Sequence, residues 1–482
     1  MQDIEKLLEY DKKIDCWFDN HKEEMVEDII RLSRIPSVSE PDEEIKPFGK
    51  ECRRVLDEAF AIAREHGFVT ENYEYYVGAV SEKKTDAKNT IGFWNHLDVV
   101  PAGEGWEKDP YEPFVKEGYL IGRGVRDNKG PAVAMMYLMQ CVRELHIPFN
   151  HELCLYLGTN EEKQMADIEY FTSHYEAPAL SVIADTGFPV CYGEKGILEG
   201  NLVSKEKFSS KVCELSGGQA SNMIPDRAWA VLECTEKEAL HIQYKLPEKL
   251  VASYRDGKIK IEAEGTSRHS AFPHGSTNAI LVLSLFLKEA EILEERDRNL
   301  FAFLANACEG YLGENQNIAS EDEISGQTTC AGTVLRMKDK KAQLTLNIRY
   351  CITADAEKMI QNLCGYADTQ KAVWEVYNNS KPNYFPKEHP AVKLLTDYYN
   401  EATGQDTKAF VMGGGTYARK LPNAFAYGIS GVPFTKEETE RKAQLFAAGH
   451  GGAHEPDEAL HLRTYFEAAK IFTKAIMRLD RC

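Results

Sequence analysis

Short apolar segments in the first part of the chain alternate with longer segments of helical pattern. Three of them have the length of a strand: residues 89–95 (NTIGFWN), 152–158 (ELCLYLG) and 180–184 (LSVIA). The segments between them, residues 132–145 and 165–175, predict helices. Strands that alternate with helices of this length predict an α/β fold with a mostly parallel sheet sandwiched by helices.

This pattern changes in the middle of the chain and returns near its end. The middle part has alternating strands such as residues 226–234 and 342–349, with a helical stretch at residues 279–304 between them. The α/β pattern then resumes, with helices predicted at residues 390–401 and 457–479.

The length of 482 residues is too great for one ordinary domain. We therefore expect a catalytic domain in two parts, residues 1–190 and 386–482. Residues 191–385 are expected to form an inserted α+β lid domain between them.

Charge and composition argue against several classes of protein. The net charge of −19 disfavours nucleic-acid binding, because no basic stripe could neutralise phosphates. The longest apolar run, residues 279–287 (AILVLSLFL), is too short to span a membrane. The first residues, MQDIEKLLEYDKKIDCW, lack the apolar core of a secretion signal. The 12 cysteines include no C-x-x-C pair, which favours a reduced, cytoplasmic compartment.

The three strand-length segments all lead into side chains that bind metals. The first runs into His96, the second into Glu161 and Glu162, and the third into Asp185. Ligands of open parallel sheets bind outside the carboxyl ends of the strands, so these side chains are expected at one edge. A single carboxylate after a strand means little because turns favour aspartate, but three successive strand ends favour a site.

Two short spacings within this set have a physical use. His96 and Asp98 are two residues apart, so in extended chain they point the same way, and Asp98 could accept the ring N–H that His96 does not use for a metal. Of Glu161 and Glu162, one could bind a metal while the other acts as a general base. Taken alone, the first spacing is equally compatible with an ordinary loop, and the second with an exposed acidic turn.

Longer motifs carry a resemblance to a known family. Four of them are His96-Leu97-Asp98-Val99-Val100-Pro101, Gly122-Arg123-Gly124-x-x-Asp127-x-Lys129-Gly130-Pro131, Thr159-Asn160-Glu161-Glu162 and Ala453-His454. Together they resemble the acetylornithine deacetylase/carnosinase family of cocatalytic zinc metallopeptidases.

Three further motifs resemble the bacterial Xaa-His dipeptidase (dipeptidase V, carnosinase-like) branch of that family in particular. They are Phe188-Pro189-Val190-x-Tyr192-x-Glu194-Lys195-Gly196, Gly217-Gly218-x-Ala220-x-Asn222-Met223-x-Pro225-Asp226 and Gly413-Gly414-Gly415-Thr416-Tyr417-x-Arg419. The motifs follow the family's order over nearly the whole chain.

The resemblance implies a site with two divalent metal ions, with zinc favoured and manganese or cobalt as alternatives. Asp127 would bridge the ions, and the other implied ligands are His96, Asp185, Glu162 and His454. Three ligand carboxylates and a bridging hydroxide would balance the charge of the two ions. Glu161 would be the general base on the metal-bridging water, and Asp98 would orient His96.

The resemblance also implies groups that contact the substrate. His269, in a motif similar to the family's lid histidine, would donate to the tetrahedral oxyanion. Arg349 would hold the substrate carboxylate with its bidentate fork. Asn222 would be a further polar contact, and the backbone of Gly414 and Gly415 would line the substrate site. Without the resemblance, Arg349 would be interpreted as a strand-end surface charge.

The implied activity is metal-dependent hydrolysis of the amide bond of dipeptides, in a chain that could work as a monomer. An N-acyl-amino-acid deacylase or desuccinylase would share every catalytic residue, and a catalytically inactive binding protein is a more remote alternative. The sequence departs from the branch at Asn128, where a second aspartate is usual, and at Lys163 and Arg268 near the base and the lid histidine. These departures bear on substrate preference more than on the chemistry.

Overall fold

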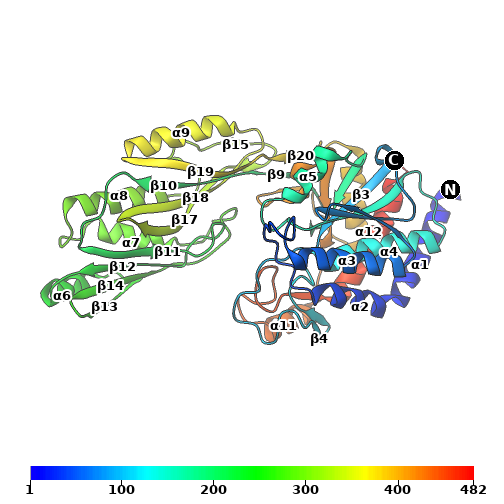
Figure 1. Ribbon diagram of the computed structural model, residues 1–482, viewed down its shortest axis with the longest axis horizontal. Helices are drawn as coiled ribbons and strands as arrows, with labels where there is room; N and C mark the ends of the chain where they lie inside the picture. Colours follow the sequence, from blue (N-terminus) through cyan, green and yellow to red (C-terminus); the bar gives the residue numbers. More distant parts are fainter. Residues whose placement is uncertain (1, 482) are drawn as a thin grey trace. The chain divides into compact units, whose positions relative to one another are not determined.

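The computed structural model describes residues 2–481, which divide into two compact units (Figure 1). The first unit contains the chain up to Tyr192, residues Tyr384–Phe410, and the chain from Gly415 onward. The second unit contains Gly193–Asn383 and Val411–Gly414. The chain therefore leaves the first unit after its first 192 residues and returns to it later.

The first unit combines helices with one large sheet and several short strands. Its helices are α1 (Gln2–Asn20), α2 (Lys22–Ser33), α3 (Lys50–Glu65), α4 (Lys129–Glu144), α5 (Ala166–His174), α10 (Pro390–Thr403), α11 (Lys436–Leu445) and α12 (Leu462–Leu479), with 3-10 turns η1 (Ala87–Asn89) and η2 (Tyr417–Lys420). Its strands are β1 (Val69–Tyr73), β2 (Val77–Ser81), β3 (Thr90–His96), β4 (Phe114–Lys116), β5 (Tyr119–Ile121), β6 (Glu152–Gly158), β7 (Leu180–Ile183), β8 (Thr186–Gly187), β9 (Val190–Glu194), β20 (Asn383–Tyr384), β21 (Phe410–Met412), β22 (Ala424–Tyr427), β23 (Ile429–Ser430) and β24 (Ala459–His461). Three of them, β9, β20 and β21, lie where the chain passes from one unit to the other.

The large sheet has the strand order β1-β2-β6-β3-β7-β22-β9-β20, with β21 paired to β9. Its centre is parallel, since β3 pairs in parallel with both β6 and β7, and β22 pairs in parallel with β7. Towards the edges, β2 runs antiparallel to β6 and β9 runs antiparallel to β22. The structure thus confirms the α/β fold, with antiparallel strands added on both sides of the parallel centre.

Strand β3 explains why helices must cover this sheet. All seven of its residues are buried, so neither face of the strand meets water. A parallel strand buried on both faces needs helices on both sides. Helix α4 packs against β3 and β6, and α2 and α12 pack against α4.

Three of the predicted elements differ in the structure. Helix α4 begins at Lys129, three residues before the predicted start at residue 132. The last helix begins at Leu462, because Ala459–His461 forms β24 and pairs with β5. The helical stretch at 279–304 is two helices, which the connection at residues 288–294 separates.

The second unit is an antiparallel sheet with helices. Its strands are β10 (Gly196–Ser204), β11 (Val212–Gly217), β12 (Arg227–Glu233), β13 (Leu250–Arg255), β14 (Lys258–Glu264), β15 (Glu321–Asp322), β16 (Gly326–Gln327), β17 (Thr329–Lys338), β18 (Lys341–Tyr350) and β19 (Ala372–Ser380), and its helices are α6 (Glu236–Lys245), α7 (Ala279–Leu287), α8 (Glu295–Cys308) and α9 (Ala356–Thr369). Eight strands form the sheet in the order β13-β14-β12-β11-β17-β18-β10-β19.

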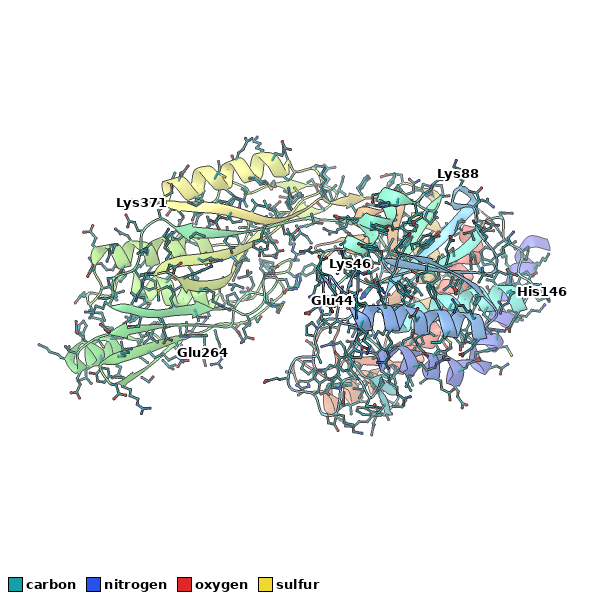
Figure 2. The ribbon with its side chains drawn as sticks, viewed as in Figure 1. Glu44, Lys46, Lys88, His146, Glu264 and Lys371 are labelled. Carbon is teal, nitrogen blue, oxygen red and sulfur yellow. The ribbon has the colours of Figure 1, made fainter. Side chains whose placement is uncertain are left out.

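The core of the second unit comes from the sheet and the helices that pack on it. Helix α7 contacts β12 and β14, and α9 contacts β19. Strand β14 alternates buried and less buried residues, which is the pattern of a strand with one face on a core. Charged side chains such as Glu264 and Lys371 are exposed on the surface of this unit (Figure 2).

Two further features concern membrane-spanning helices and the state of the cysteines. No helix within residues 2–481 combines the length and the apolar character that a membrane crossing requires. All eleven cysteines of the described part of the chain are free thiols.

Candidate metal centre

Four of the predicted site residues follow the carboxyl ends of adjacent parallel strands. His96 is the last residue of β3, Glu161 and Glu162 follow β6, and Asp185 lies two residues beyond β7. His96 is level with the end of β6, and β7 pairs with the other side of β3. Because the three strands are parallel neighbours, their ends bring these side chains to one edge of the sheet.

Asp127 lies between two histidines at this edge. Its Oδ1 is 3.1 Å from Nε2 of His96, and its Oδ2 is 3.2 Å from Nε2 of His454. Each histidine also has a second carboxylate nearby. Oδ2 of Asp185 is 3.7 Å from His96 Nε2, and Oε1 of Glu162 is 2.9 Å from His454 Nε2. The two oxygens of Asp127 therefore face two different sets of ligand atoms, as a bridging carboxylate requires.

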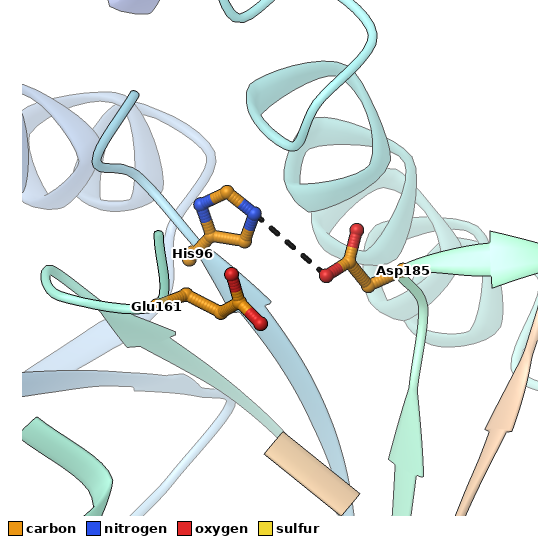
Figure 3. Close-up of side chains that lie close together, drawn as sticks. All are labelled: His96, Glu161 and Asp185. Carbon is orange, nitrogen blue, oxygen red and sulfur yellow. Dashed lines mark ion pairs between the residues drawn. The ribbon is translucent and has the colours of Figure 1, made fainter. Parts of the chain in front are cut away.

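Glu161 lies close to one of these sets. Potential ligand atoms of His96, Glu161 and Asp185, the side chains drawn in Figure 3, lie within 4.8 Å of one another. The same limit holds for His96, Asp127 and Glu162. Within residues 2–481, no other side chain hydrogen-bonds to the Glu161 carboxylate. Glu162, in contrast, is held by His454. The two neighbouring glutamates thus differ in their partners although both reach the centre.

Asp98 holds the backbone that carries both glutamates. It is fully buried, and its Oδ1 and Oδ2 accept the backbone N–H groups of Glu161 and Glu162 at 3.0 Å each. Nδ1 of His96 is 3.0 Å from the backbone carbonyl of Asp98 and 3.5 Å from its carboxylate. The carbonyl is therefore the nearer partner of the ring, where the sequence suggested the carboxylate.

Asn128 fixes the carboxylate of Asp185. Its Nδ2 donates to Oδ1 of Asp185 at 2.6 Å, and Asn95 donates to Oδ1 of Asn128. Asn128 therefore does not cap helix α4 with its side chain, although it occupies the N-cap position. One oxygen of Asp185 is held in this way, and the other faces His96.

The electrostatics of this cluster fit divalent cations. Burial is the largest cause that raises the pKa of Glu161, Glu162 and Asp185. Hydrogen bonds to Asp127 and Glu162 raise the pKa of His454 to about 11. Buried acids that crowd together in this way are favoured in their ionised form by a bound cation. The imidazole and carboxylate donors suit zinc, manganese or cobalt.

Glu458 holds the segment that carries Asp127. Its Oε1 accepts the backbone N–H groups of Arg126 and Asp127 at 2.9 and 3.0 Å. Its Oε2 accepts from Arg123 at 2.7 Å, and each of these two side chains is only 1% exposed. This buried pair links the segment before α4 to the segment that carries His454.

We expect the Arg123→Met variant to lose about 3–5 kcal/mol of stability, because it leaves the Glu458 carboxylate buried without its cation. Thermal unfolding followed by calorimetry measures this loss. The matched control is Arg34→Met, since Arg34 is 57% exposed and 3.9 Å from Glu112. This control should change stability by less than about 1 kcal/mol. An equal, small effect of both variants would contradict the role given to the buried pair.

The remaining predicted residues lie in the second unit, except for Gly415, which begins the last part of the first unit. Arg349, near the end of β18, is 6% exposed and donates to Oδ1 of Asn347 and to the backbone carbonyl of Gly413. Asn347 Oδ1 also accepts from the hydroxyl of Ser270.

The segment that carries His269 is connected to the same group. The backbone N–H of Ser270 donates to the carbonyl of Asn222, and the N–H of Ala271 donates to Nδ1 of His269. Within the second unit, Asn222, His269, Arg349 and the Gly413–Gly414 segment therefore belong to one hydrogen-bonded neighbourhood.

Sequence reasoning missed three residues that position the centre. Asn95 and Glu458 were not singled out, and Asn128 was noted only as a departure from the branch. A signal existed for Asn95 and Asn128, which are direct sequence neighbours of the candidate ligands His96 and Asp127. Glu458 lies four residues after His454, and only the fold shows that it reaches the Asp127 segment.

The sequence of the chain is similar to those of known peptidases. The model of peptidase family M20/M25/M40 matches residues 92–478. A Bacillus subtilis (strain 168) protein named "Putative dipeptidase YtjP" is 28% identical over 476 residues, which cover 95% of this chain and 98% of that protein. A Staphylococcus saprophyticus protein named "Putative dipeptidase SSP1012" is also 28% identical, over 96% of this chain and 99% of its own length.

Solved structures show the same fold. Human carnosine dipeptidase 1 gives a TM-score of 0.59 at 14% identity and covers 98% of this chain and 99% of its own. An aminoacylhistidine dipeptidase from Vibrio alginolyticus gives 0.53 at 12% identity, covering 94% and 96%. The resemblance seen in the sequence motifs is thus confirmed by the family match and by these structural neighbours.

Proposed function

The chain belongs to peptidase family M20/M25/M40, and on that premise we propose that it hydrolyses the amide bond of dipeptides with two metal ions and with Glu161 as general base. It is a hydrolase of the metallopeptidase class, and its relatives are named as dipeptidases. The observation that carries the two-metal proposal is the position of Asp127, whose two oxygens face His96 and His454 separately.

We assign the ligands by these contacts. His96 and Asp185 would hold one ion, Glu162 and His454 the other, and Asp127 both. Zinc is the first candidate, and manganese and cobalt suit the same donors. When bound, the ions would polarise the scissile carbonyl and lower the pKa of the attacking water.

The residues of the chain would then move protons and hold the substrate. Glu161 takes a proton from the attacking water and passes it to the leaving amine nitrogen. Two observations support this role. The Glu161 carboxylate lies beside the centre, and within residues 2–481 it has no hydrogen bond to a histidine, whereas Glu162 is hydrogen-bonded to His454. Asp98 keeps the Glu161 carboxylate in place through the backbone N–H that it binds.

Roles in substrate binding rest on the motif resemblance. His269 is proposed to donate to the oxyanion of the tetrahedral intermediate, and Arg349 to pair with the substrate carboxylate. Asn222 and the backbone of Gly414 and Gly415 are proposed as further contacts. The burial of Arg349 supports a dedicated role over an ordinary surface charge, because buried arginines are rare unless paired.

A substrate panel separates this proposal from the nearest alternative, a deacylase or desuccinylase with the same catalytic residues. We expect the zinc-loaded protein to hydrolyse Ala-Ala and β-Ala-Ala faster than N-acetyl-Ala and N-succinyl-Ala. Faster hydrolysis of the acylated amino acids would replace the dipeptidase proposal by the alternative. Absence of hydrolysis of all four would favour the binding-protein alternative.

We also propose that the protein works in the cytoplasm and as a monomer. The free thiols of the described cysteines support a reducing compartment. All five proposed ligands come from one chain, so a second copy is not needed to complete the metal centre.

A further inference from the structure

A cavity of about 620 Å³ in the first unit adjoins the metal centre. Its wall includes Asp127 and Asp185, together with Arg126, Lys442 and Tyr119. Every lining residue belongs to the first unit, so the cavity is complete within that unit. Its volume is within the range of small-molecule sites.

The wall carries two cations that have no acidic partner in the cavity. Within residues 2–481, neither Arg126 nor Lys442 has a carboxylate oxygen within the 4.0 Å of an ion pair. The only carboxylates in the wall are Asp127 and Asp185, which face the histidines of the metal centre and Asn128. The two cations are therefore not paired with the two carboxylates of the wall, and both remain available to a bound anion.

The ammonium of Lys442 lies near another residue of the wall. Its ammonium lies 5.8 Å from the ring centre of Phe434, which also lines the cavity. Burial, and then the positive charge of Arg126, lowers the pKa of Lys442, so Arg126 disfavours the charged form of this lysine. The negative charge of Glu455 raises the pKa of Lys442, but Glu455 is not part of the wall, and its carboxylate accepts the N–H of Gly452.

A neutral donor lies in the same wall. Tyr119 is 2% exposed, and its hydroxyl has no hydrogen-bond partner among the residues that the structure describes. A buried hydroxyl without a partner costs free energy, which a bound acceptor would recover. Two cations and an unpartnered hydroxyl together are the groups that bind a carboxylate.

We propose that this cavity is a carboxylate-binding subsite, formed by Arg126 and Lys442, that makes the enzyme prefer dipeptides with an aspartate or glutamate side chain. The inference rests on the proposed dipeptidase function and names its substrate class. A substrate carboxylate would relieve the repulsion between the two cations and replace the water lost from them. The acidic residue can be on either side of the scissile bond. The side chains of both residues branch from Cα atoms that are bonded directly to the amide, one to its carbon and one to its nitrogen.

Kinetics with matched dipeptides test this subsite. We expect kcat/KM of the zinc-loaded protein to be higher for Glu-Ala or for Ala-Glu than for Ala-Ala, and lowest for Lys-Ala. Whichever of the first two is preferred identifies the position of the acidic residue. Lys442→Gln should lower the ratio of the acidic to the neutral substrate by roughly tenfold or more, the value of a lost charged hydrogen bond. Lys442→Glu should shift the preference towards Lys-Ala.

Lys436→Gln is the matched control, because it makes the same change on the same helix at a side chain that is 90% exposed. It should leave the substrate ratio unchanged. Hydrolysis of Ala-Ala without a preference for acidic dipeptides, or a ratio that both lysine variants change equally, would overturn the subsite and leave the proposed function standing. Failure to hydrolyse Ala-Ala or any acidic dipeptide would overturn the proposed function and the subsite with it.

Discussion

Replacing Glu161 by glutamine is expected to lower the turnover of Ala-Ala by roughly 10²- to 10⁴-fold while the bound metal stays unchanged. An amide of the same shape cannot accept the proton of the attacking water. Because no other side chain within residues 2–481 hydrogen-bonds to the Glu161 carboxylate, the substitution breaks no such contact. Its effect should therefore fall on catalysis, and it is measured by steady-state kinetics with mass-spectrometric metal analysis.

The neighbouring substitution is the matched control for this experiment. Glu162→Gln makes the same chemical change one residue later, at the carboxylate that lies 2.9 Å from His454. We expect this variant to bind less metal as well as to lose activity. A Glu161→Gln protein with normal turnover would show that Glu161 is not the base. If Glu161→Gln lost metal and Glu162→Gln did not, Glu161 would be the metal ligand and Glu162 the general base.

Replacing Asp127 by alanine is expected to abolish turnover and to remove most of the bound metal. Within residues 2–481, Asp127 is the one carboxylate whose two oxygens face both histidines, at 3.1 and 3.2 Å. Its removal would take a ligand from both ions at once, whereas each of the other ligands would serve one ion. Metal content per chain, measured after dialysis against metal-free buffer, checks the prediction directly.

Asp397→Ala is the control for that loss. Asp397 lies on α10, is 60% exposed and pairs with Lys393, so its removal should change neither metal content nor turnover. If Asp127→Ala retained the metal content of the unaltered protein, Asp127 would not be a shared ligand. A circular dichroism spectrum like that of the unaltered protein would separate loss of metal from loss of folding.

The sequence predicted the centre of the large sheet well because its strands are buried on both faces. Residues 152–158 were predicted as a strand and form β6 with the same bounds. Such strands are continuous apolar runs, which are visible without any knowledge of their neighbours. The edge of the sheet was less visible, since the antiparallel pairing of β2 with β6 depends on contacts between distant segments.

Predictions near the end of the chain were less accurate for the same reason. Residues 457–479 were predicted as one helix, but Ala459–His461 is drawn into a strand by its pairing with β5. β5 is more than 300 residues earlier in the sequence, so local pattern could not reveal the pairing. Long-range pairing of this kind overrides local propensity.

The candidate ligands could be named from the sequence, but their supporting groups could not. Strand ends identified His96, the pair Glu161 and Glu162, and Asp185, and the motif resemblance chose Glu162 from the pair and added Asp127 and His454. The contacts of Asn128 with Asp185 and of Glu458 with the Asp127 segment required the fold, because polar partners are chosen by proximity in space. Supporting groups of this kind orient metal ligands and tune the site.

Titration of the metal-free protein with Zn²⁺, followed by hydrolysis of Ala-Ala, tests the two-metal dipeptidase most directly. We expect no activity without metal and a rise that reaches its plateau when two ions are bound per chain. Full activity of the metal-free protein, or a plateau at one bound ion, would contradict a bridged pair of ions at Asp127.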